Sequence, residues 1–212
     1  MKTIVKSILA GSLLVFLSVA AYAADVAAVD PREVKIPADD GDPIYSEQYG
    51  AGTHVLILVH MNNGRPSDWK EQAQKLAGLG FYAVAIPMDT NAVVRTVRHF
   101  QKSGVKKISL IGASRGADAV GNAAKQLPPG TLHRVIMLSA WDISGTDAIT
   151  GEKMFAHSKN EKDSNWMLEK FNKANEPKKL LVLEGRNHGL RIFEDETEGK
   201  KLFEAIVSFL KS

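Results

Sequence analysis

The stretch KKISLIGASRGADAVGNAAKQL, residues 106–127, contains the clearest fold signal in the chain. Its first part, residues 106–114, is an apolar run with β-branched residues, which predicts a buried strand. Its second part, residues 115–127, is rich in alanine and precedes the helix-breaking sequence PPG. The two parts meet at Ser114, which has a glycine two residues before it and another two residues after it. The stretch therefore predicts a strand that turns sharply into a helix, with a serine at the turn.

The same alternation of strand and helix continues in both directions from this stretch. The further predicted strands are residues 54–60, 82–87, 133–141, 152–158 and 178–185, and the further predicted helices are residues 66–80, 91–104, 163–175 and 197–211. Residues 33–50 resemble a hairpin with the turn DDGD. Such regular alternation predicts an α/β fold with a mostly parallel central sheet flanked by helices.

The N-terminal segment has the three-part layout of a secretory signal peptide. Lys2 and Lys6 precede an apolar core of about a dozen residues, and the small residues AYA end at Ala23. The core is shorter than the roughly 20 residues that a membrane-spanning helix requires. We therefore expect residues 1–23 to be cleaved, residues 24–32 to form a loose leader and residues 33–212 to form one domain. The mature protein is expected to be periplasmic or secreted, with no membrane span.

Composition limits the function classes that remain. The full chain has 27 basic and 24 acidic residues, and loss of the two signal-peptide lysines leaves a mature net charge near +1. That balance gives no reason to expect nucleic-acid binding. The 189 residues after Ala23 suit a single domain with one sizeable core. The chain has no cysteine, so packing rather than disulfides must stabilise it in an oxidising compartment. The sequence contains no feature from which an oligomeric state follows.

The motif GASRG at residues 112–116 matches the pattern G-x-S-x-G. In this pattern the serine occupies a strained turn between strand and helix, so that its hydroxyl projects from the sheet edge. The residues two before and two after must be small because strand and helix nearly touch there. The predicted strand before Ser114 and the predicted helix after it supply the context that the bare pattern lacks. No G-K-[ST] sequence follows, which argues against a phosphate-binding loop.

A serine hydroxyl needs a base at neutral pH, and histidine is the usual one. The chain has six histidines, and five of them lie on or beside predicted strands and helices, at residues 54, 60, 99, 133 and 157. His188 differs because it lies between two glycines in the loop EGRNHG, just after the last predicted strand. We therefore predict that His188 is the base that activates Ser114.

A third residue must orient the imidazole and balance its charge, so a carboxylate is needed at the end of another strand. Asp163 ends the segment HSKNEKD, between a predicted strand and a predicted helix, where it can also cap the helix. The order serine, acid, histidine is the one that nucleophile-elbow enzymes use. We predict Asp163 as the acid. Glu161 and Asp142 are the alternatives.

Four segments together, ILVHMNNG, IGASRGA, HSKNEKDS and GRNHG, resemble the α/β-hydrolase fold, and most closely its small dienelactone-hydrolase and carboxylesterase-type members. The resemblance covers roughly residues 33–211. It implies an α/β-hydrolase domain that attacks carbonyl carbons. The family also has a branch with a cysteine nucleophile, which a chain without cysteine cannot follow. Many members carry a cap domain between the sixth and seventh strands, but only about a dozen residues are available here, so we expect no substantial cap.

The resemblance also implies an oxyanion hole, because family members use the loop after the third strand, where His-Gly is usual, for one donor. Here His60 is followed by Met61 instead of glycine. We predict the backbone N–H groups of Met61 and Arg115 as donors, with Asn62 as the alternative to Met61. The expected pocket residues are Asn62, Asn63 and Trp141, within an open site whose walls include residues 61–64, 88–89 and 141.

The sequence thus predicts an exported serine hydrolase that cleaves carboxylic esters of small molecules through Ser114, His188 and Asp163. Two alternatives remain open. The same residues can act on amide, peptide or thioester bonds or in acyl transfer, and the chain can be a non-catalytic binding protein on a hydrolase scaffold. No paired histidines stand at metal-ligand spacing on one helix, and we expect neither a metal nor another cofactor.

Overall fold

A computed structural model of the chain describes residues 30–37, 41–162 and 164–212. The described residues form one sheet of eight strands in the order β1-β2-β4-β3-β5-β6-β7-β8. The strands are β1 (Arg32–Ile36), β2 (Ile44–Tyr49), β3 (His54–Val59), β4 (Tyr82–Ile86), β5 (Lys107–Ala113), β6 (Arg134–Leu138), β7 (Glu152–Ser158) and β8 (Lys178–Leu183). The first two strands are antiparallel, and β3 to β8 run parallel to one another. This sheet confirms the predicted α/β class.

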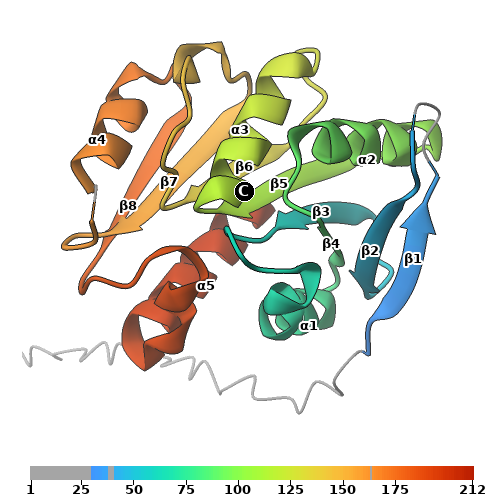
Figure 1. Ribbon diagram of the computed structural model, residues 1–212, viewed down its shortest axis with the longest axis horizontal. Helices are drawn as coiled ribbons and strands as arrows, with labels where there is room; N and C mark the ends of the chain where they lie inside the picture. The colour runs from blue at the N-terminus through green and yellow to red at the C-terminus, as the bar shows by residue number, and fades with distance from the viewer. Residues whose placement is uncertain (1–29, 38–40, 163) are drawn as a thin grey trace, which may run out of the picture.

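Helices cover both faces of the sheet. They are α1 (Lys70–Gly78), α2 (Thr90–Lys102), α3 (Arg115–Gln126), α4 (Ser164–Lys173) and α5 (Glu196–Lys211), with short 3-10 helices η1 (Pro66–Trp69), η2 (Thr146–Ala148) and η3 (Gly189–Glu194). Figure 1 shows α2, α3 and α4 on one side of the sheet and α1 and α5 on the other. The protein therefore has three layers, with helices on each side of a central sheet.

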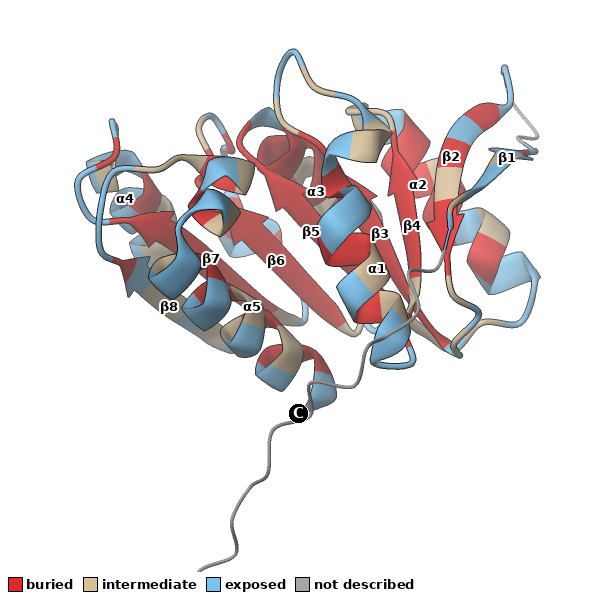
Figure 2. Cartoon of the chain, turned by 90° about the horizontal axis from the view of Figure 1, so that it is seen from below, coloured by how far each residue is buried: buried red, intermediate tan, exposed pale blue. Residues whose placement is uncertain are grey.

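Alternate residues of the strands feed two separate cores. In β3, Val55, Ile57 and Val59 pack under α2 and α3, whereas Leu56 and Leu58 pack under α1 and α5. All six residues of β3 are buried, as is the case for a parallel strand covered on both faces. Figure 2 shows the central strands as a continuous buried layer. Burial of each such aliphatic side chain contributes about 1.5 to 3 kcal/mol, and it is this hydrophobic packing that holds the layers together.

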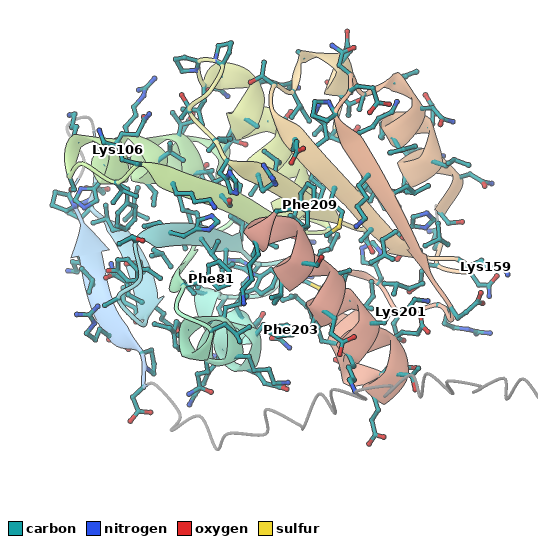
Figure 3. The ribbon with its side chains drawn as sticks, turned by 180° about the vertical axis from the view of Figure 1, so that it is seen from behind. Phe81, Lys106, Lys159, Lys201, Phe203 and Phe209 are labelled. Carbon is teal, nitrogen blue, oxygen red and sulfur yellow. The ribbon has the colours of Figure 1, made fainter. Side chains whose placement is uncertain are left out.

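The helix α5 closes the second core. Its buried residues Leu202, Ile206, Phe209 and Leu210 follow the helical spacing of an amphipathic face. Figure 3 shows α5 lying across this face of the sheet, with Phe203 on the side toward α1. The ammonium group of Lys75 on α1 lies 6.0 Å from the centre of the Phe203 ring. The apolar face of α5 therefore covers this side of the sheet.

The predicted elements are all present, with small shifts at their ends. The predicted helix 66–80 begins as the 3-10 helix η1 before it becomes α1, which ends at Gly78. The strand β1 begins at Arg32, inside the segment predicted as leader. The predicted signal peptide and residues 24–29 lie outside the described residues, as do residues 39 and 40 of the predicted DDGD turn.

The carboxyl ends of the parallel strands meet at one edge of the sheet. The loops that follow β3, β5, β6, β7 and β8 all emerge there, so residues distant in sequence come together at this edge. Residues 139–151 connect β6 to β7 and contain only the single turn η2, which confirms that no substantial cap is present. Within the described residues, no helix combines the length and apolar character that crossing a membrane requires.

Candidate active site

The predicted turn between strand and helix is present at the end of β5. A Cβ atom placed on Gly112 would lie 2.2 Å from the carbonyl oxygen of Gly116, and one placed on Gly116 would lie 2.3 Å from the carbonyl oxygen of His60. Both distances are shorter than any tolerated contact. The two glycines of the motif are thus required by close approach of β3, β5 and α3, as the motif predicts.

Ser114 itself has a strained backbone, with φ 53° and ψ −122°. A positive φ is uncommon for a residue other than glycine and costs of order 1 to 3 kcal/mol. Its N–H donates to the carbonyl of Leu138, and its carbonyl accepts from the N–H of Ala117. The turn is therefore anchored to β6 on one side and to α3 on the other, which holds the serine at the sheet edge.

In the described residues, the non-glycine positions with positive φ are Asn63, Ser114 and Ser139. All three follow the carboxyl ends of neighbouring strands, namely β3, β5 and β6. Backbone strain of this kind persists only where the surrounding structure enforces it, and it gathers at functional sites. Its concentration at one edge of the sheet marks that edge as the candidate site.

His188 lies next to Ser114. Its Nε2 is 2.8 Å from Ser114 Oγ, and its Nδ1 is 3.2 Å from Glu161 Oε2. A carboxylate only accepts hydrogen bonds, so Nδ1 carries a proton and donates it. With Nδ1 protonated, the lone pair of the neutral imidazole is on Nε2, where it accepts from the serine hydroxyl. The structure thus brings together the predicted nucleophile and the predicted base in the orientation that proton transfer requires.

The carboxylate at this histidine is that of Glu161, which the sequence analysis ranked as an alternative to Asp163. The Glu161 side chain is only 2 % exposed, whereas that of His188 is 33 % exposed. Asp163 lies outside the described residues. The prediction of Asp163 as the acid is therefore not tested. Among the described carboxylates, it is that of Glu161, one of the two alternatives, that meets the imidazole.

The turn after β7 explains how Glu161 reaches the site. The N–H of Lys159 donates to the carbonyl of Leu183, the last residue of β8, and the N–H of Asn160 donates to that of Gly185, just beyond the strand. The Glu161 N–H then bonds back to the carbonyl of Ser158 at 3.3 Å. This turn directs Glu161 inward. Glu161 lies two residues before Asp163, the acid that the sequence analysis preferred.

Two other acidic or basic candidates occupy different places. Asp142, the second alternative acid, is exposed, and its N–H donates to Asp118 Oδ1 at 3.0 Å. His157 is buried at the end of β7, where its Nδ1 is 3.0 Å from the Ser158 carbonyl and 4.0 Å from Glu161 Oε1. The latter distance is too long for a hydrogen bond.

The loop after β3 contains the predicted oxyanion donor Met61. Its carbonyl accepts from the N–H of Gly64 at 3.1 Å and lies 2.8 Å from Nδ1 of His60. His60 Nε2 accepts from the N–H of Met88 at 3.2 Å, so the proton of this imidazole is on Nδ1. His60 therefore ties the Met61 turn to the loop after β4, a structural role that the sequence analysis did not anticipate.

Arg115, the other predicted donor, opens α3. Its N–H is among the first of the helix, which have no carbonyl partner within the helix and are the ends to which the helix dipole attracts negative charge. The Met61 side chain extends toward His188, since its sulfur would lie 3.2 Å from a Cβ placed on Gly189. Both residues are thus neighbours of the Ser114–His188 pair, Arg115 through the chain and Met61 through its side chain. Their role as oxyanion donors remains a prediction.

The predicted pocket residues lie on different parts of the rim. Asn62 and Asn63 are exposed on the turn after β3. Trp141 is half-buried in the loop after β6, where its ring centre lies 5.8 Å from that of Trp166 on α4. The backbone N–H of Trp141 donates to Asp118 Oδ1 at 2.9 Å, and the backbone N–H of Asp142 donates to the same oxygen. Burial raises the pKa of the Asp118 carboxyl, while these backbone N–H groups and Arg115 act in the opposite direction.

Two cavities adjoin the site. One of about 380 Å³ is lined by Met61 and Leu190 and by polar or charged residues that include Glu71, Gln72 and Arg191. The other, of about 270 Å³, lies beside Arg115 and is lined by Met88 and by the carboxylates of Asp89, Asp118 and Asp142. The predicted walls at residues 61, 88 and 89 are therefore cavity walls. Both spaces suit a small substrate with polar groups.

Sequence reasoning missed the serines that follow two other strands. Ser139 comes directly after β6 and contacts both Glu161 and the His188 loop, and Ser158, the last residue of β7, donates to the carbonyl of Asn187 at 2.7 Å. The signal that points to them is a serine at the end of an apolar run, in IMLS and FAHS, as in LIGAS. Among the described residues, no group of three His, Cys, Asp or Glu side chains is arranged to hold a metal ion.

No family model matches the sequence, and no curated protein matches it. Solved structures do match in three dimensions. Dienelactone hydrolase from Anabaena variabilis has a TM-score of 0.75 at 13% identity and covers 87% of this chain and 98% of its own. An esterase from Exiguobacterium antarcticum has a TM-score of 0.70 at 13% identity, covering 85% and 100%.

A dienelactone hydrolase-like promiscuous phosphotriesterase from metagenomic libraries has a TM-score of 0.70 at 15% identity and covers 87% of this chain and 98% of its own. These likenesses extend over nearly the whole of each similar protein, and they confirm the predicted resemblance at the level of the fold. The chain has the α/β-hydrolase fold without a large cap domain. At such low identities, activity must be argued from the residues of this chain.

Proposed function

We propose that this protein is a serine hydrolase that cleaves carboxylic esters of small molecules, with Ser114 as nucleophile, His188 as general base and Glu161 as the acid that orients the base. The observation that carries the proposal is the chain of two contacts from Ser114 Oγ to His188 Nε2, 2.8 Å, and from His188 Nδ1 to Glu161 Oε2, 3.2 Å. These are the distances and the order of roles that define a catalytic triad.

The reaction follows from these positions. Ser114 Oγ attacks the ester carbonyl while His188 Nε2 takes the hydroxyl proton, and the buried Glu161 carboxylate stabilises the imidazolium. The N–H groups of Arg115 and Met61 donate to the oxyanion of the tetrahedral intermediate. His188 then returns the proton to the leaving alcohol, which gives an acyl-enzyme on Ser114. Water, activated by the same histidine, attacks the acyl-enzyme and releases the carboxylic acid.

Two further points support an ester substrate of modest size. The structurally similar proteins include some that are named dienelactone hydrolase and esterase. The cavities beside the site are small, and polar or charged side chains make up much of their walls. Amide, peptide and thioester hydrolysis and acyl transfer use the same triad, so a panel of matched acetyl esters, amides and thioesters is the direct way to separate them.

The test of the proposed nucleophile is labelling with a fluorophosphonate probe, followed by identification of the modified peptide. We expect labelling at Ser114 that is lost in Ser114→Ala and reduced in His188→Ala, together with hydrolysis of p-nitrophenyl acetate by the unchanged protein. An unlabelled, inactive protein with intact fold would favour the alternative of a binding protein on a hydrolase scaffold.

We also propose that the protein is exported to the periplasm or secreted after removal of residues 1–23. The support is the sequence alone, with two lysines before an apolar core and AYA at its end. The intact mass of the protein expressed from the full gene tests this proposal. A mass that begins at Ala24 is expected, and a mass that retains Met1 or lacks only Met1 would contradict cleavage.

A further inference from the structure

Ser139 occupies an unusual position at the candidate site. It is the first residue after β6, is only 2 % exposed and has a φ of 49°. Its N–H donates to the carbonyl of Ala156 at 2.8 Å, which extends the pairing of β6 with β7 by one residue. The backbone of Ser139 is thus fixed by the sheet in a conformation that serine rarely adopts. Glycine adopts it freely, so a serine at this position has a backbone cost that contacts of its side chain can offset.

The side chain makes two hydrogen bonds, and both lead to the proposed triad. Ser139 Oγ donates to Glu161 Oε2 at 2.8 Å and accepts from the N–H of Gly189 at 2.9 Å. Glu161 Oε2 is the same oxygen that His188 Nδ1 contacts, and Gly189 directly follows His188. One buried hydroxyl therefore links the acid to the backbone of the base, across three loops that are separated in sequence.

We propose that Ser139 is a positioning residue that holds Glu161 and His188 in register for catalysis. This inference rests on the proposed function. With its proton directed at Glu161 and its lone pair at Gly189, the hydroxyl fixes both the carboxylate rotamer and the start of η3. Gly189 packs near Ser114, since a Cβ placed on it would lie 3.7 Å from Ser114 Cβ. A shift of this loop therefore changes the approach of the imidazole to the nucleophile.

A second contact separates positioning from folding. Ser158 Oγ holds the same loop independently, through its 2.7 Å hydrogen bond to the carbonyl of Asn187. Loss of the Ser139 hydroxyl thus leaves the His188 loop attached to β7 and removes only the bridge between Glu161 and Gly189, so that the direct contact of His188 with Glu161 is no longer supported. We expect the protein to fold without this hydroxyl and to lose alignment of the triad.

The test compares Ser139→Gly and Ser139→Ala with Ser46→Ala. Glycine removes the hydroxyl and suits the positive φ, whereas alanine removes the hydroxyl and keeps the strain. Ser46 is the matched control, because it is a fully buried serine on β2 whose Oγ also donates one hydrogen bond and accepts another. It donates to the carbonyl of Val34 and accepts from the Gln48 side chain. It lies on the antiparallel strand β2, between β1 and β4 and away from the site.

We expect kcat on p-nitrophenyl acetate to fall roughly 10- to 100-fold in both Ser139 variants, with KM within about twofold, because misplacement of a reacting group by about 1 Å costs rates of this size. The downfield proton NMR signal of His188 Nδ1–H is expected to shift or broaden in Ser139→Gly and to stay in place in Ser46→Ala. If Ser139 had only a structural role, its replacement would neither lower kcat at constant KM nor change this NMR signal.

Two results would overturn the inference while leaving the proposed function intact. One is a kcat for Ser139→Gly within twofold of that of the unchanged protein, which is itself labelled at Ser114. The other is activity that merely follows the melting temperature across the glycine and alanine variants. Absence of labelling at Ser114 in the unchanged protein is a different result, which would overturn the proposed function and this inference together.

Discussion

A serine and a histidine form a pair near each end of the strand β5, and the distance between the serine oxygen and the histidine nitrogen is the same in both pairs. At the carboxyl end, Ser114 Oγ lies 2.8 Å from His188 Nε2, and near the amino end, Ser109 Oγ lies 2.8 Å from His54 Nε2. By distance alone the two pairs are equivalent. Their surroundings show which one is suited to chemistry.

The pair at the amino end has a buried, structural environment. Ser109 is fully buried within the strand, and the His54 ring packs edge-on against Phe81 and His133 at 5.2 and 5.1 Å. Burial, with the cations of Lys107 and Arg134 nearby, lowers the pKa of His54 to about 4. An imidazole that resists a positive charge is poorly suited to take a proton in a transition state.

The pair at the carboxyl end differs in three respects. Its serine follows the strand in a strained turn, its histidine is partly exposed, and the other ring nitrogen of that histidine meets the buried Glu161 carboxylate. In the proposed reaction, this carboxylate stabilises the imidazolium that forms when the serine gives up its proton. The comparison shows that the contact between serine and histidine is not sufficient. The strained turn and the acid distinguish a candidate nucleophile from a hydroxyl that only provides a hydrogen-bond partner for a buried side chain.

Exchange of the two serines for alanine is expected to give the largest contrast. Ser114→Ala should lower kcat on p-nitrophenyl acetate by at least about 10⁴-fold, since removal of a triad nucleophile leaves only background catalysis. Ser109→Ala should retain turnover but destabilise the fold by about 1 to 3 kcal/mol, because it leaves His54 Nε2 buried and unpaired. Esterase kinetics and urea unfolding measure the two effects. If Ser114→Ala kept its turnover, Ser114 would not be the nucleophile, and neither pair would take part in catalysis.

Removal of the acid tests the second difference between the pairs. Glu161→Gln keeps the size of the side chain but removes the charge that stabilises the imidazolium, so we expect kcat to fall by about 10³- to 10⁴-fold. Asp163→Asn is the matched variant, and we expect its kcat within about threefold of that of the unchanged protein. The reverse pattern, with the larger loss in Asp163→Asn, would restore the acid that the sequence analysis preferred.

The amino-end pair predicts a smaller effect, on stability rather than on activity. The pKa of His54 lies at about 4 in the folded protein, below its ordinary value of 6.5. The unfolded chain therefore takes up this proton more readily. The contribution to stability is present above pH 6.5 and is lost as the pH falls toward 4. We expect the melting temperature to drop across this range, and less so in His54→Gln, whose amide can still meet Ser109.

Melting curves at intervals between pH 7 and pH 4 for the two proteins measure the difference. Because both proteins share their carboxylates, the general acid destabilisation cancels in the comparison, and only the contribution of His54 remains. Parallel curves for the two proteins would show that the amino-end imidazole has no preference for the neutral form.

The features that depend on local pattern could be predicted from the amino-acid sequence. The alternation of strands and helices predicted the α/β class. The motif GASRG predicted the turn at Ser114, because its two glycines allow the close approach of the strand, the following helix and the adjacent strand. His188 could be chosen among six histidines because a loop between two glycines after the last strand places it at the carboxyl edge. Each of these inferences uses only residue spacing and the known direction of parallel strands.

The carboxylate that meets His188 and the hydroxyl that bonds to both segments could be identified only from the folded chain. Glu161, Ser139 and Gly189 belong to three loops that follow different strands, and their contact depends on the side-chain directions in irregular backbone, which no periodicity encodes. The sequence analysis preferred Asp163, two residues further along the chain, because it lies between a predicted strand and a predicted helix. The turn after β7 directs Glu161 into the site. Backbone hydrogen bonds of this turn to Ser158, to the end of β8 and to the residues just after it hold the Glu161 side chain inward.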